Sequence, residues 1–186
     1  MQGISIAEAV CVPCRVGVAA TASDNNGVWL RVLDSHFNVA DTGVEATNIA
    51  NVHVVGTYTY LHEGVGFSRA PFHACVALTM LSQATMWAKV SGNTCDGAQM
   101  TASPKYGVYL DSTRKPASFL MEDRVEGNSF YTLDWGVFLQ NTTSVAVGSN
   151  TYAFMSKGDV FNGSNGSGIF KNTRVPPEEP LKPAAN

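Results

Sequence analysis

Apolar and polar residues alternate over short segments of this chain, and this alternation predicts strands. In the segment 84–90 the even positions hold Ala, Met, Ala and Val, whereas the odd positions hold Thr, Trp and Lys. A strand with one dry face has this period of two. The preceding segment 72–81 is mostly apolar on both parities, as expected for a strand that is buried on both sides. We therefore predict two core strands here, with Ser82-Gln83 as the bend between them.

Similar patterns recur along the chain and predict roughly nine to eleven short strands. Asn26-Gly27 and Gly148-Ser149-Asn150 predict tight hairpin connections, and Gly56 predicts a β-bulge inside a strand. The segments 42–51 and 92–103 are expected to be irregular. The other expected strands are 15–22, 28–34, 36–41, 52–61, 106–111, 117–121, 129–140, 144–147 and 151–155.

These strands and turns predict an all-β fold. Long crossovers that could hold helices are missing between the expected strands, which argues against a parallel α/β fold. Closely spaced short strands are typical of an antiparallel β-sandwich of the jelly-roll type or of a closed barrel. We expect this domain to span 15–156, after an extended N-terminal arm (1–14) and before a flexible linker with a Pro-rich C-terminal tail (157–186).

The C-terminal segment differs in composition from the rest of the chain. Residues 161–168 are rich in Gly, Ser and Asn, as flexible linkers are, and residues 175–186 contain four prolines. Such a tail favours an extended polyproline conformation and cannot pack a core of its own. We expect it to lie against a neighbouring subunit. The candidate subunit contacts are Val175, Pro176, Pro177, Pro180 and Leu181.

Charged residues are scarce, at 15% of the chain against roughly 25% in an ordinary soluble domain. Another protein covers such a surface more easily, because fewer charges must be desolvated. The net charge is −3 and the one adjacent basic pair is Arg114-Lys115, so the basic footprint of a nucleic-acid-binding protein is missing. We expect other protein subunits as partners, and no nucleic acid.

The sequence predicts neither a membrane span nor a secretion signal. No segment approaches the roughly 18 consecutive apolar residues of a transmembrane helix. Glu8, Pro13 and Arg15 interrupt the apolar run that a secretion signal would need. We expect no membrane binding and a cytoplasmic location, or a place in the virion if the protein is viral.

The four cysteines are open to more than one interpretation. Cys11 and Cys14 have the spacing of a zinc knuckle or a redox pair. However, Cys75 and Cys95 are too far apart in sequence to supply the second half of a knuckle, and the flanks of Cys11 resemble strands rather than a redox helix. We favour reduced structural thiols; one disulfide and a metal site are the alternatives.

Metal-binding motifs are incomplete. His62-Glu63 and His73 match no spacing that brings three ligands together on one helix or hairpin. We expect no metal and no cofactor.

Carboxylates give the one hint of catalysis. Asp134 lies beside Trp135, and Glu122, Asp123 and Glu126 are near in sequence. A glycosidase pair would need one of these acids in a dry pocket, but the last three fall in an expected turn, where solvation is usual. We expect no catalytic residues and no enzyme.

Aromatic residues at strand positions could form a platform on which sugar rings stack. Core packing and subunit contacts use the same residue types, and their exposure would distinguish these roles. The platform candidates are Tyr58, Tyr60, Trp87 and Trp135.

The leading hypothesis is a non-enzymatic structural or assembly protein. A virion component of a phage or virus, such as a decoration, spike or minor capsid subunit, would be held by low-charge faces and terminal arms, as a homo-oligomer or on a shell protein. The alternative is a carbohydrate-binding β-sandwich module with a host-attachment or lectin-like role. A hydrolase of unknown type is the third hypothesis, and no short motif supports it.

Overall fold

The computed structural model describes residues 3–23, 28–63, 70–81, 86–112, 123–163, 168–170 and 172–175 of the 186-residue chain. All regular elements of these described parts are strands. They are β1 (Gly3–Ala7), β2 (Val10–Thr21), β3 (Trp29–Leu33), β4 (His36–Thr47), β5 (Asn51–Val55), β6 (Tyr58–His62), β7 (His73–Met80), β8 (Trp87–Ser91), β9 (Thr94–Gln99), β10 (Lys105–Ser112), β11 (Asp123–Glu126), β12 (Ser129–Tyr131), β13 (Trp135–Gln140), β14 (Val145–Gly148), β15 (Thr151–Ala153), β16 (Gly158–Gly163), β17 (Gly168–Ile169) and β18 (Thr173–Val175).

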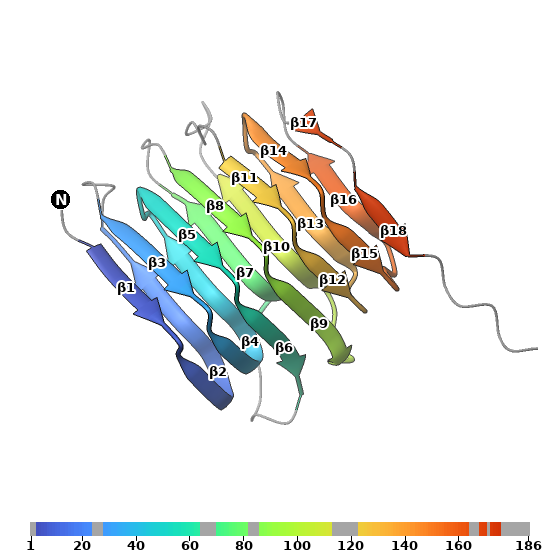
Figure 1. Ribbon diagram of the computed structural model, residues 1–186, viewed down its shortest axis with the longest axis horizontal. Coiled ribbons are helices and arrows are strands. Elements are labelled where there is room, and N and C mark those ends of the chain that lie inside the picture. The colour runs from blue at the N-terminus through green and yellow to red at the C-terminus, as the bar shows by residue number, and fades with distance from the viewer. Residues whose placement is uncertain are drawn as a thin grey trace, which may run out of the picture.

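The strands pair in parallel with strands from the next turn of the chain, as the stack of arrows in Figure 1 shows. One sheet has the order β1-β3-β5-β8-β11-β14-β17. The second sheet has two limbs, β7-β10-β13-β16 and β6-β9-β12-β15-β18, which meet at β4, and β2 pairs with β4. The predicted antiparallel sandwich of jelly-roll type is therefore wrong, although the all-β composition is confirmed.

Each turn of the chain, here called a coil, has three sides. Face 1 is the seven-stranded sheet. Face 2 contains β6, β9, β12, β15, β18 and the first halves of β2 and β4, and face 3 contains β7, β10, β13, β16 and the second halves of β2 and β4. This architecture is a parallel β-helix, in which each repeat packs on its neighbours.

Several predicted connections turn out to be corners of this solenoid. The pair β14 and β15 lies in different sheets and is no hairpin, and the same holds for β2 and β3. Gly56 is the corner between β5 and β6 rather than a bulge within one strand. Strand β4 continues to Thr47 and β9 spans Thr94–Gln99, both in segments that were expected to be irregular. The predicted bend at Ser82-Gln83 and the predicted strand 117–121 lie outside the described residues.

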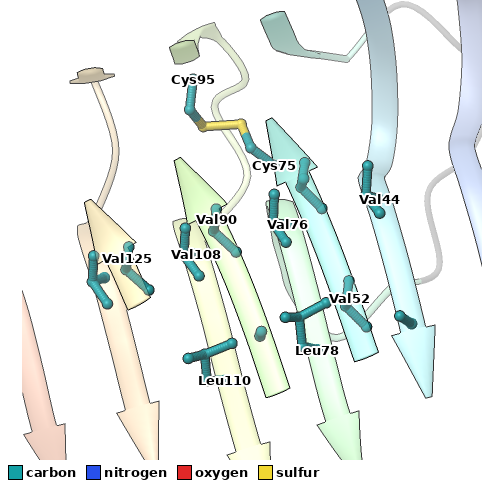
Figure 2. Close-up of a cluster of buried hydrophobic side chains, with 14 of the residues drawn as sticks. Val44, Val52, Cys75, Val76, Leu78, Val90, Cys95, Val108, Leu110 and Val125 are labelled. Carbon is teal, nitrogen blue, oxygen red and sulfur yellow. A yellow bond between two sulfur atoms is a disulfide. The ribbon is translucent and has the colours of Figure 1, made fainter. Parts of the chain in front are cut away.

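The core is built from rows of the same residue type in neighbouring coils. On face 3, residues in register form the row Val18–Val44–Val76–Val108–Val137–Val160. A second valine row runs along face 1 through Val32, Val54, Val90, Val125 and Val147. Figure 2 shows side chains of both rows pointing into the common interior. β-branched residues suit these positions because they pack well on a pleated surface.

Aromatic side chains on face 2 fill the remaining space and require glycines opposite them. A Cβ atom on Gly136 would lie 2.2 Å from the buried ring of Tyr152, and one on Gly107 would lie 2.3 Å from Phe130. Cys95 on β9 is in register with Phe130, and it forms a disulfide in the core with Cys75 on β7 (Figure 2). Cys11 and Cys14 form a second disulfide, so the structure contains paired cysteines where we favoured reduced thiols.

A ladder of buried asparagines fixes the corner between faces 1 and 2. The backbone N–H of Asn93 donates to Oδ1 of Asn128 (3.0 Å), that of Asn128 to Asn150 (2.9 Å), and that of Asn150 to Asn172 (3.1 Å). The Nδ2 groups of Asn93, Asn128 and Asn150 also donate to carbonyl oxygens of face 1 residues, as from Asn128 to Val90 (3.0 Å). This asparagine ladder satisfies backbone groups that the corner removes from the sheets.

The residues before Asn93, Asn128 and Asn150 have positive φ values, as a sharp corner requires. Gly92 and Gly127 have φ values of 66° and 67°, and Ser149 has 55°. Glycine adopts this conformation without steric cost. The ladder is therefore encoded by a left-handed residue followed by an inward-facing asparagine.

The predicted arm and tail are only partly described. Residues 3–7 and 10–14 belong to β1 and β2 in the first coil. Within the predicted linker and tail, β16 pairs with β13, β17 pairs with β14 and β18 pairs with β15.

The asparagine ladder gives a stability prediction. Replacing Asn128 with Ala leaves the N–H of Asn93 and the carbonyl of Val90 buried without partners, so we expect the free energy of unfolding to fall by about 3 kcal/mol. Asn128→Asp should also destabilise, since the carboxylate cannot donate to Val90. Urea unfolding followed by circular dichroism measures both effects. The matched control is Asn51→Ala on the outer side of face 1; an equal loss in this control would contradict the role of the ladder.

Candidate functional site: two ordered arrays on the outer surface

Six aromatic side chains gather on the outer side of face 3. They form a cluster separate from the main core. Tyr109, Phe138 and Phe161 are in register, and residues adjoining them, such as Val108 and Leu110, face the interior. The other three rings lie near the starts of β10, β13 and β7. The members of this aromatic ladder are Phe72, Tyr106, Tyr109, Trp135, Phe138 and Phe161.

The rings of the ladder stack on one another along the axis of the solenoid. Ring centroids are 4.5 Å apart for Phe72 and Tyr109, 5.6 Å for Tyr109 and Phe138, and 4.4 Å for Phe138 and Phe161. Tyr109 and Phe138 therefore have neighbours on both ring faces. Stacking of this kind contributes roughly 0.5–1.5 kcal/mol per pair. A sugar would need a free ring face, so the ladder presents mainly ring edges to a partner.

A hollow of about 410 Å³ lies beside the ladder, over the first three coils. Arg15, Glu45, Phe72 and Ala77 are among its lining residues. Ala77 is in register with Tyr109 on the next strand. The guanidinium of Arg15 donates twice to one carboxylate oxygen of the buried Asp41, at 2.9 and 2.6 Å. Face 3 thus has a polar half next to an aromatic half.

The outer side of face 1 carries a row of basic residues. Arg31, His53, Lys89 and Arg124 are in register on four successive strands. Arg31, Lys89 and Arg124 are exposed, and His53 is half-buried. Burial, followed by the charges of Arg31 and Lys89, lowers the pKa of His53. We call these four residues the basic row.

Tryptophans accompany the basic row on the same outer side. Trp87 and Trp29 are aligned through Asn51, which lies between them in register. The guanidinium of Arg31 lies 5.4 Å from the ring centroid of Trp29. Trp87 is 45% exposed and lines a hollow of about 450 Å³ together with His53, Lys89, Arg124 and Glu126.

The four predicted platform residues lie on three different faces. Tyr58 and Tyr60 stack on the outer side of face 2, with centroids 6.3 Å apart. Trp87 lies on face 1 and Trp135 in the aromatic ladder of face 3. Burial raises the pKa of Tyr58, and the negative charge of Asp96 adds to this effect. The structure therefore does not bring the four together into one platform.

The predicted subunit contacts are mostly beyond the described parts. Val175 ends β18, which pairs with β15. Pro176, Pro177, Pro180 and Leu181 lie outside the described residues.

Histidines and acids that could suggest a metal site have other roles. His73 is buried and its Nδ1 lies 2.7 Å from the carbonyl oxygen of Ala40. The carboxylate of Glu63 accepts hydrogen bonds from the backbone N–H groups of Thr101 (2.6 Å) and Ala102 (3.0 Å). Within the described parts of the chain, no three His, Cys, Asp or Glu side chains converge as metal ligands would.

The acids that suggested a glycosidase pair are held at different corners. Burial raises the pKa of Asp134, but hydrogen bonds from the Ser156 hydroxyl and the Lys105 N–H outweigh it, and the pKa is lowered overall. Burial raises the pKa of Asp123 to about 8. Asp123 begins β11 on face 1, whereas Asp134 lies between faces 2 and 3. Glu122 lies outside the described residues.

Both arrays are missed by motif analysis because their members are far apart in sequence. Arg31 and His53 are neighbours in space and 22 residues apart, and Lys89 and Arg124 are 35 residues apart. The coils also differ in length, so the members of each array recur at no fixed period. The basic and aromatic residues fall into columns only when the strands are aligned by their register.

Comparison with known proteins gives no relative for this chain: no family model matches it, and neither a curated protein nor a solved structure is significantly similar. The described residues include no helix with the length and apolar character needed to cross a membrane.

Asp123 gives a prediction on pH. Its carboxylate accepts a hydrogen bond from the N–H of Ala88, and its second oxygen is buried without a partner among the described residues. Since the pKa rises from 3.8 in the unfolded chain to about 8 on folding, the folded state binds the proton more tightly, and stability falls as the pH increases from about 4 to about 8. We expect Asp123→Asn to remove this decline and to be more stable at pH 8 by a few kcal/mol, at about 1.4 kcal/mol per pKa unit.

Urea unfolding at several pH values measures this effect. Asp134→Asn is the matched control with the opposite sign, because the pKa of Asp134 is lowered in the folded state. We expect it to reduce stability at neutral pH. If Asp123→Asn were less stable than the wild type at pH 8, the buried charge would not be the cause of the decline.

Proposed function

We propose that the protein is a non-enzymatic structural subunit that self-associates through the aromatic ladder on the outer side of face 3. The observation that carries this proposal is a continuous stripe of stacked aromatic side chains on the outer side of face 3. Phe161 is 37% exposed at one end of it, and Tyr109, Phe138 and Trp135 are half-buried. Aromatic residues are enriched in the centres of protein interfaces.

The two halves of face 3 favour a symmetric dimer. The aromatic half covers β10, β13 and β16, and the polar half with Arg15 and Glu45 covers β2 and β4. In a dimer with twofold symmetry, the same patch on both copies must be self-complementary. A two-fold axis near Phe138 would pair the two ladders and leave the polar halves at the rim of the interface.

The low content of charged residues supports the same proposal. Only 15% of the chain is charged, so lateral packing of rods would desolvate few charges. A virion spike, fibre or decoration subunit is the class of assembly that we propose. In such an assembly a rigid solenoid would present faces 1 and 2 while face 3 is covered.

The alternative function, carbohydrate binding, is favoured by a different surface. Neighbouring rings cover the ring faces inside the aromatic ladder, whereas Trp87 on face 1 has an exposed side chain beside cationic groups. We therefore assign subunit contact to face 3 and keep carbohydrate binding for face 1.

Self-association can be tested by analytical ultracentrifugation over a range of concentrations. We expect the wild type to form dimers or larger oligomers, and Phe161→Lys to be displaced towards the monomer, because a cation would be buried in the interface without a partner. A symmetric dimer of this variant would have to bury two lysine side chains, and we expect their desolvation to weaken the dimer by at least about tenfold. Phe138→Lys should act in the same direction.

The matched control is Tyr58→Lys on face 2, since Tyr58 is 38% exposed and Phe161 is 37% exposed. We expect this variant to associate like the wild type. Circular dichroism would establish that all variants are folded. A monomeric wild type at the highest concentration, or equal effects of the face 2 and face 3 variants, would refute the proposal.

A further inference from the structure

The basic row on face 1 places cationic side chains at a constant spacing along the solenoid. Neighbouring strands are about 4.8 Å apart, and Arg31, His53, Lys89 and Arg124 occupy consecutive strands in register. The row therefore spans three strand spacings, about 14 Å. The row runs parallel to the axis of the solenoid and perpendicular to the strands.

Such a row has an energetic cost in the isolated protein. Like charges directly opposite each other on adjacent strands are destabilising. The ion pairs of the described residues are Arg15–Asp41, Lys157–Asp134 and Arg174–Asp159, and they include none of the basic row. Glu126 is the acid in the hollow that Lys89 and Arg124 line. An anionic ligand would relieve the repulsion that this row creates.

The tryptophan beside the row adds a second recognition element. Trp87 precedes Lys89 by two residues on the same side of β8, so the indole and the ammonium group lie on one surface. Both line the hollow of about 450 Å³. An indole ring binds the C–H face of a sugar, while a lysine or arginine binds its carboxylate or sulfate.

We propose that the basic row and Trp87 form a binding site for an extended acidic polysaccharide that lies along face 1. The sugar rings would contact Trp87, and carboxylate or sulfate groups would contact Lys89, Arg124 and Arg31. This site is on a different face from the aromatic ladder and does not depend on the self-association proposed above.

Two other polyanions fit the surface less well. A single-stranded nucleic acid is held by a long positively charged groove and by aromatic rings for successive bases, whereas this row has three permanent cations and the protein has a net charge of −3. An acidic peptide would use the cations but would leave the exposed indole of Trp87 without a specific partner. A polymer of acidic sugars uses both features.

His53 gives the site a dependence on pH. It faces Arg31 and Lys89 on the adjoining strands, with Arg124 and Glu126 in the same hollow. Burial and the two neighbouring cations lower its pKa, so the imidazole is neutral at pH 7. A bound anion favours the protonated form, and binding should therefore tighten as the pH decreases from about 7 to about 5.

Isothermal titration calorimetry with β-1,4-linked glucuronan oligosaccharides tests the proposal, and the methyl esters of the same oligosaccharides are the uncharged control ligand. We expect the acid form to bind and the ester to bind at least about tenfold more weakly. A sulfated cellulose oligosaccharide distinguishes sulfate from carboxylate as the preferred anion. Lys89→Gln with Arg124→Gln should weaken binding by about tenfold.

Matched variants separate this site from general charge effects. Lys157→Gln with Arg174→Gln removes the same charge elsewhere, and we expect it to retain binding. Trp87→Ala should weaken both ligand forms, and His53→Gln should remove the increase in affinity at low pH. No binding of the acid form, equal losses in the two double variants, or tighter binding of a single-stranded oligonucleotide or of polyglutamate would each overturn the proposal. Phe161→Lys alters face 3 and leaves face 1 intact. Measuring glucuronan binding with this variant therefore tests the face 1 site separately from self-association.

Discussion

Parallel pairing in register is the constraint on which the whole structure depends. Every coil must turn its corners at the same place as the coil beside it, or the next strand loses its partners. At the corner between faces 1 and 2 this is achieved by a left-handed residue and an inward asparagine, as in Gly127-Asn128. The Asn128 side chain accepts hydrogen bonds from Asn93 and donates to Asn150 and Val90. The corner is thus hydrogen-bonded from coil to coil, as the strands are.

The same constraint shapes the outer surface. Any outward side chain lies one strand spacing, about 4.8 Å, from the side chain at the same position of the next coil. Similar residues therefore accumulate into rows, such as the stacked rings of Tyr109, Phe138 and Phe161. The inner rows of valine stabilise the solenoid, and the outer rows can differ from face to face without disturbing that core.

The sequence predicts the strands well and their arrangement poorly, for identifiable physical reasons. Alternation of apolar and polar residues indicates which side of a strand faces inward, and this pattern is the same in a sandwich and in a solenoid. Strands are therefore correctly predicted in segments such as 106–111 and 151–155. The lack of helical crossovers argues against a parallel α/β fold, but here faces 2 and 3 return the chain to face 1 and the strands pair in parallel without helices. Gly56 and Ser149-Asn150 were interpreted as a bulge and a hairpin, although both are corners. The arrays on faces 1 and 3 could not be seen, since their members come from different coils and need the register to be known.

The pitch of the solenoid also restricts which ligands its outer rows can bind. A compact molecule that fits one hollow can touch Lys89 and Arg124, which are adjacent, but Arg31 lies two strands beyond Lys89. A ligand that engages the entire basic row must therefore be extended along the axis and must repeat its charge over similar distances. Such a ligand gains affinity with each coil that it contacts, as multivalent binding does. The repeat that organises the core would in this way set the length of polymer that the surface recognises.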